Sequence, residues 1–182
     1  MDPKASDSAR ARARFLYELG RARSAAGTAL VVVPFAAVAI FVWEASPAIV
    51  GLGAALYLLA SALLFRGQVY GAAVGLGLAA GAVPLVAPLL FRESGACCVG
   101  GACWPGCMVA CAASGVAAGL FVGWSAAKRP ERPGTFWVAA ATVAALTGSL
   151  GCVTMGLTSV LSMVSALLAA SIPTWGVLRA RA

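Results

Sequence analysis

The chain has 182 residues and a formal net charge of +7; 62% of its residues are apolar and only 10% are charged. A soluble domain of this length has too little interior to bury so much apolar surface, which excludes an ordinary soluble globular protein. The sequence contains no histidine, which excludes imidazole as a metal ligand, general base or proton switch.

The N-terminal segment, residues 1–24, is rich in arginine and is predicted to be cytoplasmic. Residues 8–23 within it have the pattern of an amphipathic helix. One side carries Phe15, Leu16 and Leu19, and arginines cover much of the rest. We expect this helix to lie on the cytoplasmic membrane surface, where its arginines meet anionic lipid headgroups rather than nucleic acid. The alternative is that it docks a soluble cytoplasmic regulatory protein.

The remainder, residues 25–182, forms one membrane domain with six apolar segments, each long enough to cross a hydrocarbon core of about 30 Å. The segments cover residues 25–43, 47–65, 69–91, 107–127, 135–155 and 157–178. A tight turn is predicted near Gly156, because residues 135–178 are too long for one crossing. A cleaved signal peptide is the competing interpretation of the first segment, but residues 43–45 form a poor cleavage site. The predicted fold class is all-α: an integral membrane bundle of six transmembrane helices preceded by a short amphipathic cytoplasmic surface helix.

Lysine and arginine near the segment ends predict the orientation of the bundle. In a six-span topology twelve of the thirteen basic residues fall on one side, and Arg92 alone falls on the other. We therefore expect a multi-pass protein of the bacterial inner (plasma) membrane with both termini in the cytoplasm. Tryptophan prefers the membrane interfaces. By this topology Trp43 and Trp104 mark the outer interface, and the inner interface carries Trp124, Trp137 and Trp175.

Small residues recur at a spacing of four in two of the segments. Residues four apart share a helix face, and glycine lets two backbones approach closely. The glycines concerned are Gly71, Gly75, Gly77 and Gly81 in the third segment and Gly115, Gly119 and Gly123 in the fourth. We therefore predict that the third and fourth spans pack together. Pro84 and Pro88 each remove a backbone donor from the third span and are predicted to kink it.

The spans contain no Asp, Glu, Lys or Arg away from their ends. Ion-coupled transporters usually keep such a group inside the membrane, so an autonomous secondary transporter is not expected. No base is available to activate the serines within the spans, so no catalytic residue and no enzymatic activity are predicted. These serines are instead predicted to form hydrogen bonds between helices; they are Ser149, Ser159, Ser162 and Ser165.

All six cysteines fall on the outer side of this topology. Cys97, Cys98 and Cys103 lie in the loop before the fourth span, Cys107 and Cys111 lie at its outer start, and Cys152 lies near the outer end of the fifth. The spacing of four between Cys103, Cys107 and Cys111 predicts a stripe on one helix face. Thioether sulfur nearby comes from the auxiliary soft ligands Met108 and Met155, with Met163 as a third.

The cysteine cluster supports three interpretations. An even number of cysteines in an oxidising compartment is typical of structural disulfides, and a bond to Cys152 would hold the fourth and fifth spans together. Thiolates and thioethers also select soft ions, so handling or transport of copper, mercury or zinc is the second interpretation. The vicinal Cys97 and Cys98 resemble the paired cysteines of mercuric-ion transport membrane proteins, although in that family the first pair lies within the first transmembrane helix.

The third interpretation is a membrane-bound sensor or regulator, in which a change at the external thiols shifts the spans and the N-terminal helix releases or captures a partner. This architecture is similar to that of membrane-bound anti-sigma factors. A structural subunit of a larger membrane complex is a further alternative, whereas a thiol oxidoreductase lacks the Cys-x-x-Cys pair it would need. The leading prediction is a small non-enzymatic membrane protein whose extracytoplasmic cysteines bind a soft metal or form disulfides.

Overall fold

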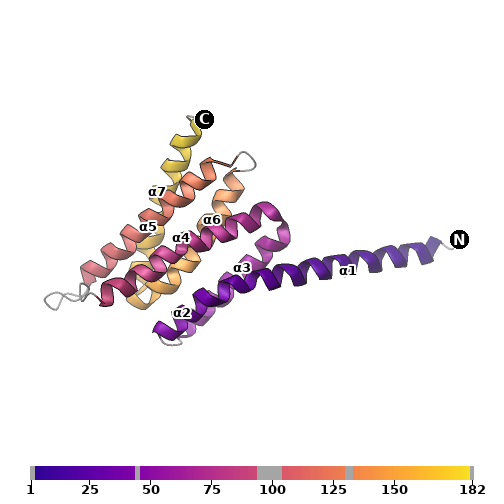
Figure 1. Ribbon diagram of the computed structural model, residues 1–182, viewed down its shortest axis with the longest axis horizontal. Helices are drawn as coiled ribbons and strands as arrows, with labels where there is room; N and C mark the ends of the chain where they lie inside the picture. The colour runs from indigo at the N-terminus through magenta and orange to yellow at the C-terminus, as the bar shows by residue number, and fades with distance from the viewer. Residues whose placement is uncertain (1–2, 44–45, 94–103, 130–132, 181–182) are drawn as a thin grey trace.

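The computed structural model describes residues 3–43, 46–93, 104–129 and 133–180, and over these residues the chain is helical, with short turns and no strand. Six helical segments are long and apolar enough to cross a membrane. Figure 1 shows them gathered in a bundle from which the N-terminal helix extends. The predicted fold class is therefore confirmed: the protein is an all-α bundle of six membrane-spanning helices that begins with an N-terminal helix.

The helices lie close to the predicted segments, except that the helix that holds the first candidate span begins well before residue 25. The elements are α1 (Pro3–Ala29), the 3-10 turn η1 (Leu30–Val32), α2 (Val33–Trp43), α3 (Pro47–Arg66), α4 (Gln68–Glu93), α5 (Trp104–Ala127), α6 (Pro133–Cys152), the 3-10 turn η2 (Val153–Met155) and α7 (Leu157–Ala180). The spans within them are Arg14–Phe41, Pro47–Arg66, Tyr70–Pro88, Met108–Ala127, Pro133–Met155 and Leu157–Ala180. The predicted turn between the last two spans is present at Gly156, whose φ is +100°.

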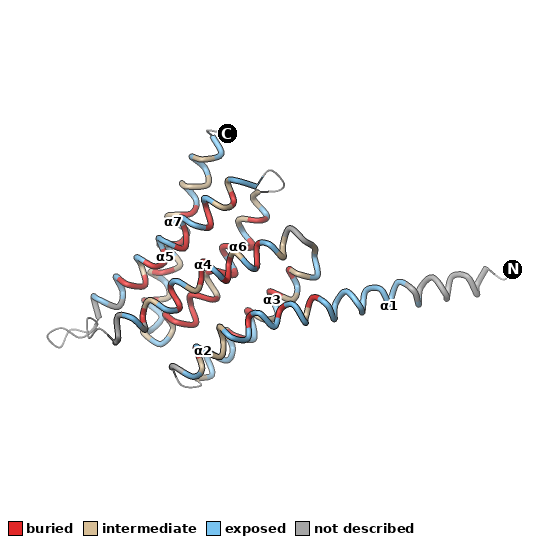
Figure 2. The backbone as a smooth tube through the Cα atoms, in the orientation of Figure 1, coloured by how far each residue is buried: buried red, intermediate tan, exposed pale blue. Residues whose placement is uncertain are grey.

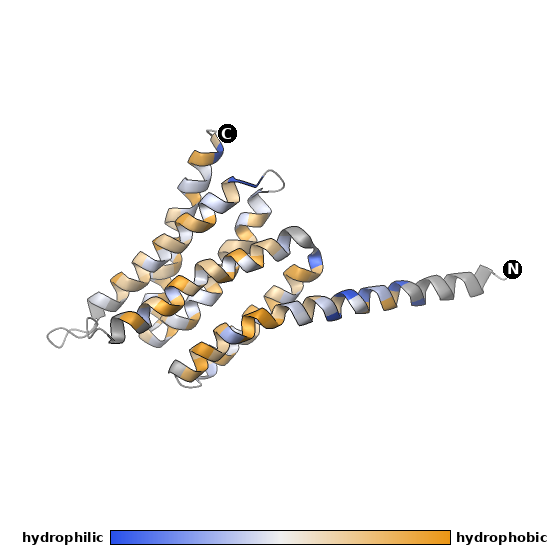
Figure 3. Ribbon diagram, viewed as in Figure 1, coloured by the Kyte–Doolittle hydropathy of each residue, from blue (hydrophilic) through white to orange (hydrophobic). Residues whose placement is uncertain are grey.

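The first crossing is built from α1, η1 and α2 in succession, with no loop between them. The 3-10 turn precedes Pro34, whose ring cannot continue the regular hydrogen-bond ladder. Beside this break, the hydroxyl of Tyr57 on α3 donates a hydrogen bond of 3.2 Å to the carbonyl of Ala26. Residues 14–24 of α1 are exposed and carry several hydrophilic side chains, and this part of the helix extends away from the bundle (Figures 2 and 3). Its placement on a membrane surface stays a prediction.

Local sequence explains how α3 starts and how it turns into α4. The hydroxyl of Ser46 accepts a hydrogen bond of 3.3 Å from the backbone N–H of Ile49, and Pro47 occupies the first helical turn, where its missing N–H costs nothing. Gly67 separates α3 from α4 with a φ of +135°, a conformation that side chains with a Cβ rarely adopt. A hairpin of two antiparallel spans results.

The glycines bring the helices together in two close pairs. A Cβ built on Gly77 of α4 would lie 2.7 Å from the Ala140 carbonyl of α6, so α4 pairs with α6. A Cβ on Gly123 of α5 would lie 2.7 Å from the Ser171 carbonyl of α7, so α5 pairs with α7. The predicted contact between the third and fourth spans exists. However, the glycine faces are used on α6 and α7 instead, and Gly75 has nothing within 4 Å.

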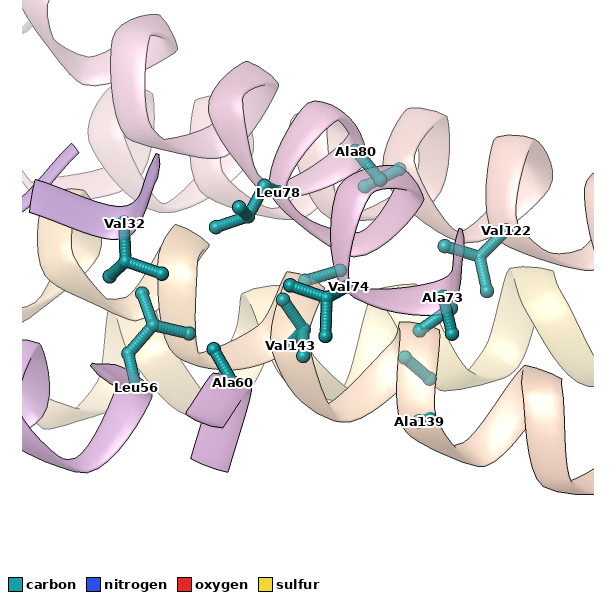
Figure 4. Packing of buried hydrophobic residues seen from close by; sticks show 14 of the residues in the cluster. Val32, Leu56, Ala60, Ala73, Val74, Leu78, Ala80, Val122, Ala139 and Val143 are labelled. Atoms are coloured by element: carbon teal, nitrogen blue, oxygen red, sulfur yellow. The ribbon is translucent and has the colours of Figure 1, made fainter. Parts of the chain in front are cut away.

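Small and medium apolar side chains fill the space between the helices. Leu56 and Val143 are fully buried, and Figure 4 shows Leu56 of α3 beside Val32 and Val143 of α6 beside Val74 of α4. In contrast, Phe41 and Leu58 are 87% and 66% exposed. Large apolar side chains that face outward fit a hydrocarbon surrounding rather than water.

Basic and aromatic side chains meet at the end of the bundle where α5 and α7 finish and α6 begins. The Lys128 ammonium lies 3.6 Å from the centre of the Trp124 ring, and Arg179 lies over Trp175 at 5.6 Å. The rings of Trp137 and Trp175 stack with centres 6.0 Å apart. The three tryptophans predicted for one interface thus do line one end of the bundle. The side chains of Trp43 and Trp104 lie outside the described residues.

Candidate functional site

Two buried cysteines from different helices meet inside the bundle. Cys111 lies in the second turn of α5 and Cys152 is the last residue of α6. Their Sγ atoms are 2.8 Å apart, although the residues are 41 positions apart in the chain. Both side chains are fully buried, and both are free thiols in the structure. This pair is the part of the predicted cysteine cluster that the structure brings together.

A third sulfur residue completes this junction. Met163 of α7 is fully buried and packs in one cluster with Cys111 and Cys152. Its methyl group reaches α6 one turn before Cys152, since a Cβ on Gly148 would lie 3.1 Å from Met163 Cε. We call Cys111, Cys152 and Met163 the sulfur cluster.

The fourth helix contributes a backbone carbonyl. Because residue 88 is proline, the carbonyl of Pro84 on α4 lacks the N–H that would normally donate to it four residues on. This oxygen lies 3.9 Å from Cys152 Sγ, within reach of the weak donor of a thiol. The sulfur cluster therefore sits where α4, α5, α6 and α7 meet, with one group from each.

Close packing of glycines makes this junction possible. The backbone of α5 touches the Met163 carbonyl of α7 at Gly115, one turn below Cys111. On the other side, a Cβ on Gly151 of α6 would lie 2.8 Å from Leu85 of α4 and 3.0 Å from the Pro84 carbonyl. Any side chain at either glycine would push a helix outward, and the two sulfur atoms would separate.

The other predicted sulfur residues are placed differently or lie outside the described residues. Cys97, Cys98 and Cys103 belong to the part of the chain that the structure does not describe, and of Cys107 only its place in the first turn of α5 is described. Because α5 begins at Trp104, Cys111 is the one member of the predicted stripe whose side chain is among those described. Met108 is 41% exposed and Met155 belongs to η2; neither joins the sulfur cluster.

One prediction about the serines is wrong. The hydroxyls of Ser149 and Ser159 donate to the backbone carbonyls of Ala145 and Met155 in the preceding turn, not to another helix. Ser162 and Ser165 do the same. The short hydroxyl side chain of serine reaches a carbonyl of the preceding turn directly, whereas a partner on a neighbouring helix has to lie within its reach. Ser114 likewise donates to the Cys111 carbonyl at 3.0 Å.

Sequence reasoning missed two features of the site. The first is the importance of Met163, which the sequence offered only as a third thioether, after Met108 and Met155. The second is the orphaned carbonyl of Pro84, for which the signal was present: two prolines four residues apart always free the carbonyl of the first. Among the described residues, no group of three or more His, Cys, Asp or Glu side chains could hold a metal ion.

Fold and site together define the class as a small helical multi-pass membrane protein with a buried sulfur junction. No family of known proteins, no curated protein and no solved structure matches this chain. Its function therefore has to be argued from the sulfur cluster and its surroundings.

Proposed function

We propose that the protein is a small non-enzymatic protein of a bacterial inner membrane whose extracytoplasmic cysteines form disulfides, with Cys111 bonded to Cys152. The observation that carries this proposal is the distance of 2.8 Å between the two Sγ atoms. Two unbonded sulfur atoms do not rest so close, whereas an S–S bond of about 2.05 Å needs only a small further approach. The proposed topology places both residues near the oxidising side of the membrane.

The bond would stabilise the bundle by joining its two close pairs of helices. The glycine contacts join α4 to α6 and α5 to α7, whereas Cys111 is on α5 and Cys152 is on α6. A disulfide between them therefore links one close pair of helices to the other. The two thiols form this bond by thiol–disulfide exchange with an extracytoplasmic oxidant. They lose two protons and two electrons, and the disulfide of the oxidant takes these up and becomes a dithiol. Burial of both sulfur atoms then shields the bond from reductants.

Peptide mapping of the protein purified from membranes tests this proposal. Free thiols are alkylated under denaturing conditions without reductant, and the digest is analysed by mass spectrometry. We expect a linked pair of peptides containing Cys111 and Cys152, which disappears after reduction. Cys111→Ser should free Cys152 for alkylation in full. Complete alkylation of both cysteines in the unreduced wild type would rule out a disulfide between Cys111 and Cys152.

A soft-metal site is the second candidate, and Met163 is the observation that favours it. Two thiols and a thioether from three helices form a donor set suited to copper or mercury, with zinc less well served by a thioether. Two thiolates on one metal lie about 3.8 Å apart for bonds of about 2.3 Å, so the sulfur atoms would have to separate. Elemental analysis of anaerobically purified protein decides between the candidates: one bound metal that is lost in Met163→Leu supports this one.

The orientation is part of the proposal and has its own test. Alkaline phosphatase is active only outside the cytoplasm, and a fluorescent protein folds best inside it. Fusions after Arg179 should give the cytoplasmic signal, and an insertion at residue 95 should give the external one. The reverse pattern would place the cysteines in a reducing compartment and remove the case for a disulfide.

A further inference from the structure

A cleft opens between α3, α4 and α6 at the arginine-rich end of the bundle, away from the sulfur cluster. Its volume is about 330 Å³, which lies at the lower end of the range for ligand pockets. Its rim is polar: Arg66 ends α3, Tyr70 lies in the first turn of α4, and Thr135 lies in the first turn of α6. No acidic residue is among the described residues that line it.

The interior of the cleft is apolar and faces sideways. Leu63 and Leu59 continue inward along α3 from Arg66, and Val138 continues along α6. Leu59 and Arg66 are seven positions apart, which corresponds to about 10 Å along the helix axis. Val138 is 55% exposed, so the cleft is open toward the side of the bundle, where the surrounding hydrocarbon lies.

Arg66 differs from the other basic residues near this end. Arg21 lies 5.2 Å from the centre of the Phe65 ring, and Arg129 and Arg179 each lie over a ring as well. Arg66 is exposed and makes no ion pair, hydrogen bond or ring contact with any residue that the structure describes. Its guanidinium offers a fork of donors beside an apolar slot, and the positive end of the α6 dipole lies next to it.

We infer that this cleft binds one anionic phospholipid from the leaflet at the arginine-rich end of the bundle. Arg66 and Tyr70 would hold the phosphate, and an acyl chain would lie along Leu63, Leu59 and Val138. Basic pockets between transmembrane helices recognise anionic headgroups, and a rim charge next to an apolar slot fits both parts of such a lipid. This inference does not depend on the disulfide or on which side of the membrane is the cytoplasm.

Native mass spectrometry of the full-length protein in mild detergent tests the inference. The protein is titrated with phosphatidylglycerol and, separately, with phosphatidylcholine. We expect one phosphatidylglycerol to bind at least fivefold more tightly, and Arg66→Gln to weaken it about fivefold, the effect of one arginine near an anionic surface. The matched control is Arg179→Gln, which removes the same charge from the last turn of α7 and should change the affinity less than twofold.

The apolar part is tested without changing any charge. Val138→Phe replaces the valine side chain by a bulkier aromatic ring in the cleft and should also lower the affinity for phosphatidylglycerol. Glycerol phosphate in large excess should not displace the lipid. Equal losses in Arg66→Gln and Arg179→Gln, no loss in Val138→Phe, or displacement by glycerol phosphate would each overturn the inference. If Arg66→Gln or Val138→Phe fails to elute as the wild type does in size-exclusion chromatography, two other variants decide. Arg66→Lys must retain the affinity for phosphatidylglycerol, and Thr142→Leu must lower it.

Discussion

Cys152 Sγ lies 3.9 Å from the carbonyl oxygen of Pro84, which lacks its regular helical donor because residue 88 is proline. The thiol can donate its hydrogen to this oxygen only while it is reduced. A bond to Cys111, whose Sγ lies 2.8 Å away, would remove that hydrogen and replace a weak contact by a covalent one. Oxidation of Cys152 would therefore replace its weak contact with α4 by a covalent link to α5, while the glycine contacts between α4 and α6 remain.

Loss of the disulfide should lower stability. Cys111 and Cys152 are 41 positions apart, and closing a loop of this length with a disulfide typically stabilises a protein by about 2–4 kcal/mol. We expect Cys111→Ala to lower the midpoint of thermal unfolding, and dithiothreitol to lower that of the wild type toward the same value. Dithiothreitol should lower the midpoint of the variant by less than it lowers that of the wild type. A wild type that is insensitive to reductant after full unfolding and refolding would contradict the prediction.

Substitution of Gly119 should separate α5 from α7. A Cβ at this position would overlap the Leu167 carbonyl, which belongs to the backbone and cannot rotate away. We expect Gly119→Val to cost about 1–3 kcal/mol or more, because overpacking forces backbone shifts. Gly75→Val is the matched control, since Gly75 sits in a span but has nothing within 4 Å. The measurement is the unfolding midpoint in a titration with sodium dodecyl sulfate, and equal midpoints for the two variants would contradict the prediction.

Periodicity and hydropathy were enough to predict the spans, because hydrocarbon requires each crossing to satisfy its backbone within one helix. They were not enough to predict which helices pair. Gly77 and Gly115 both signal close approach, but the signal does not say which backbone comes close, and the answer is α6 for one and α7 for the other. The sulfur cluster shows the same limit. The grouping of Cys111 with Cys152 follows from topology, whereas Met163 enters only through the packing of α7 on α5.

The cleft at Arg66 could not be found from sequence at all. A lone arginine at a span end is expected of any membrane protein, and it usually marks only the orientation. Its neighbours Tyr70 and Val138 lie on two other helices, and Val138 is far along the chain. A site built from three helices becomes visible only when the crossing of those helices is known.

The hydroxyl of Tyr57 should fix the break in the first span. It donates a hydrogen bond of 3.2 Å to the Ala26 carbonyl, directly before the 3-10 turn. We expect Tyr57→Phe to destabilise the protein by about 0.6–1.7 kcal/mol, the range for hydrogen bonds between membrane helices. Hydrogen exchange should also become faster for residues 26–32. Tyr17→Phe, at a position that is 71% exposed, is the control and should change neither quantity.

The N-terminal half of α1 should respond to the charge of the membrane. Phe15 and Leu16 are 63% and 58% exposed on a helix that leaves the bundle, and they stand among arginines. Such a face binds an anionic surface through both apolar contact and charge. In nanodiscs with phosphatidylglycerol, trypsin should cut after Arg12 and Arg14 several times more slowly than in pure phosphatidylcholine. Because charge contributes to this protection, 0.5 M salt should weaken it. Leu16→Glu should abolish the protection, and equal cleavage rates in both lipids would show that α1 stands free of the membrane and is available to a soluble partner.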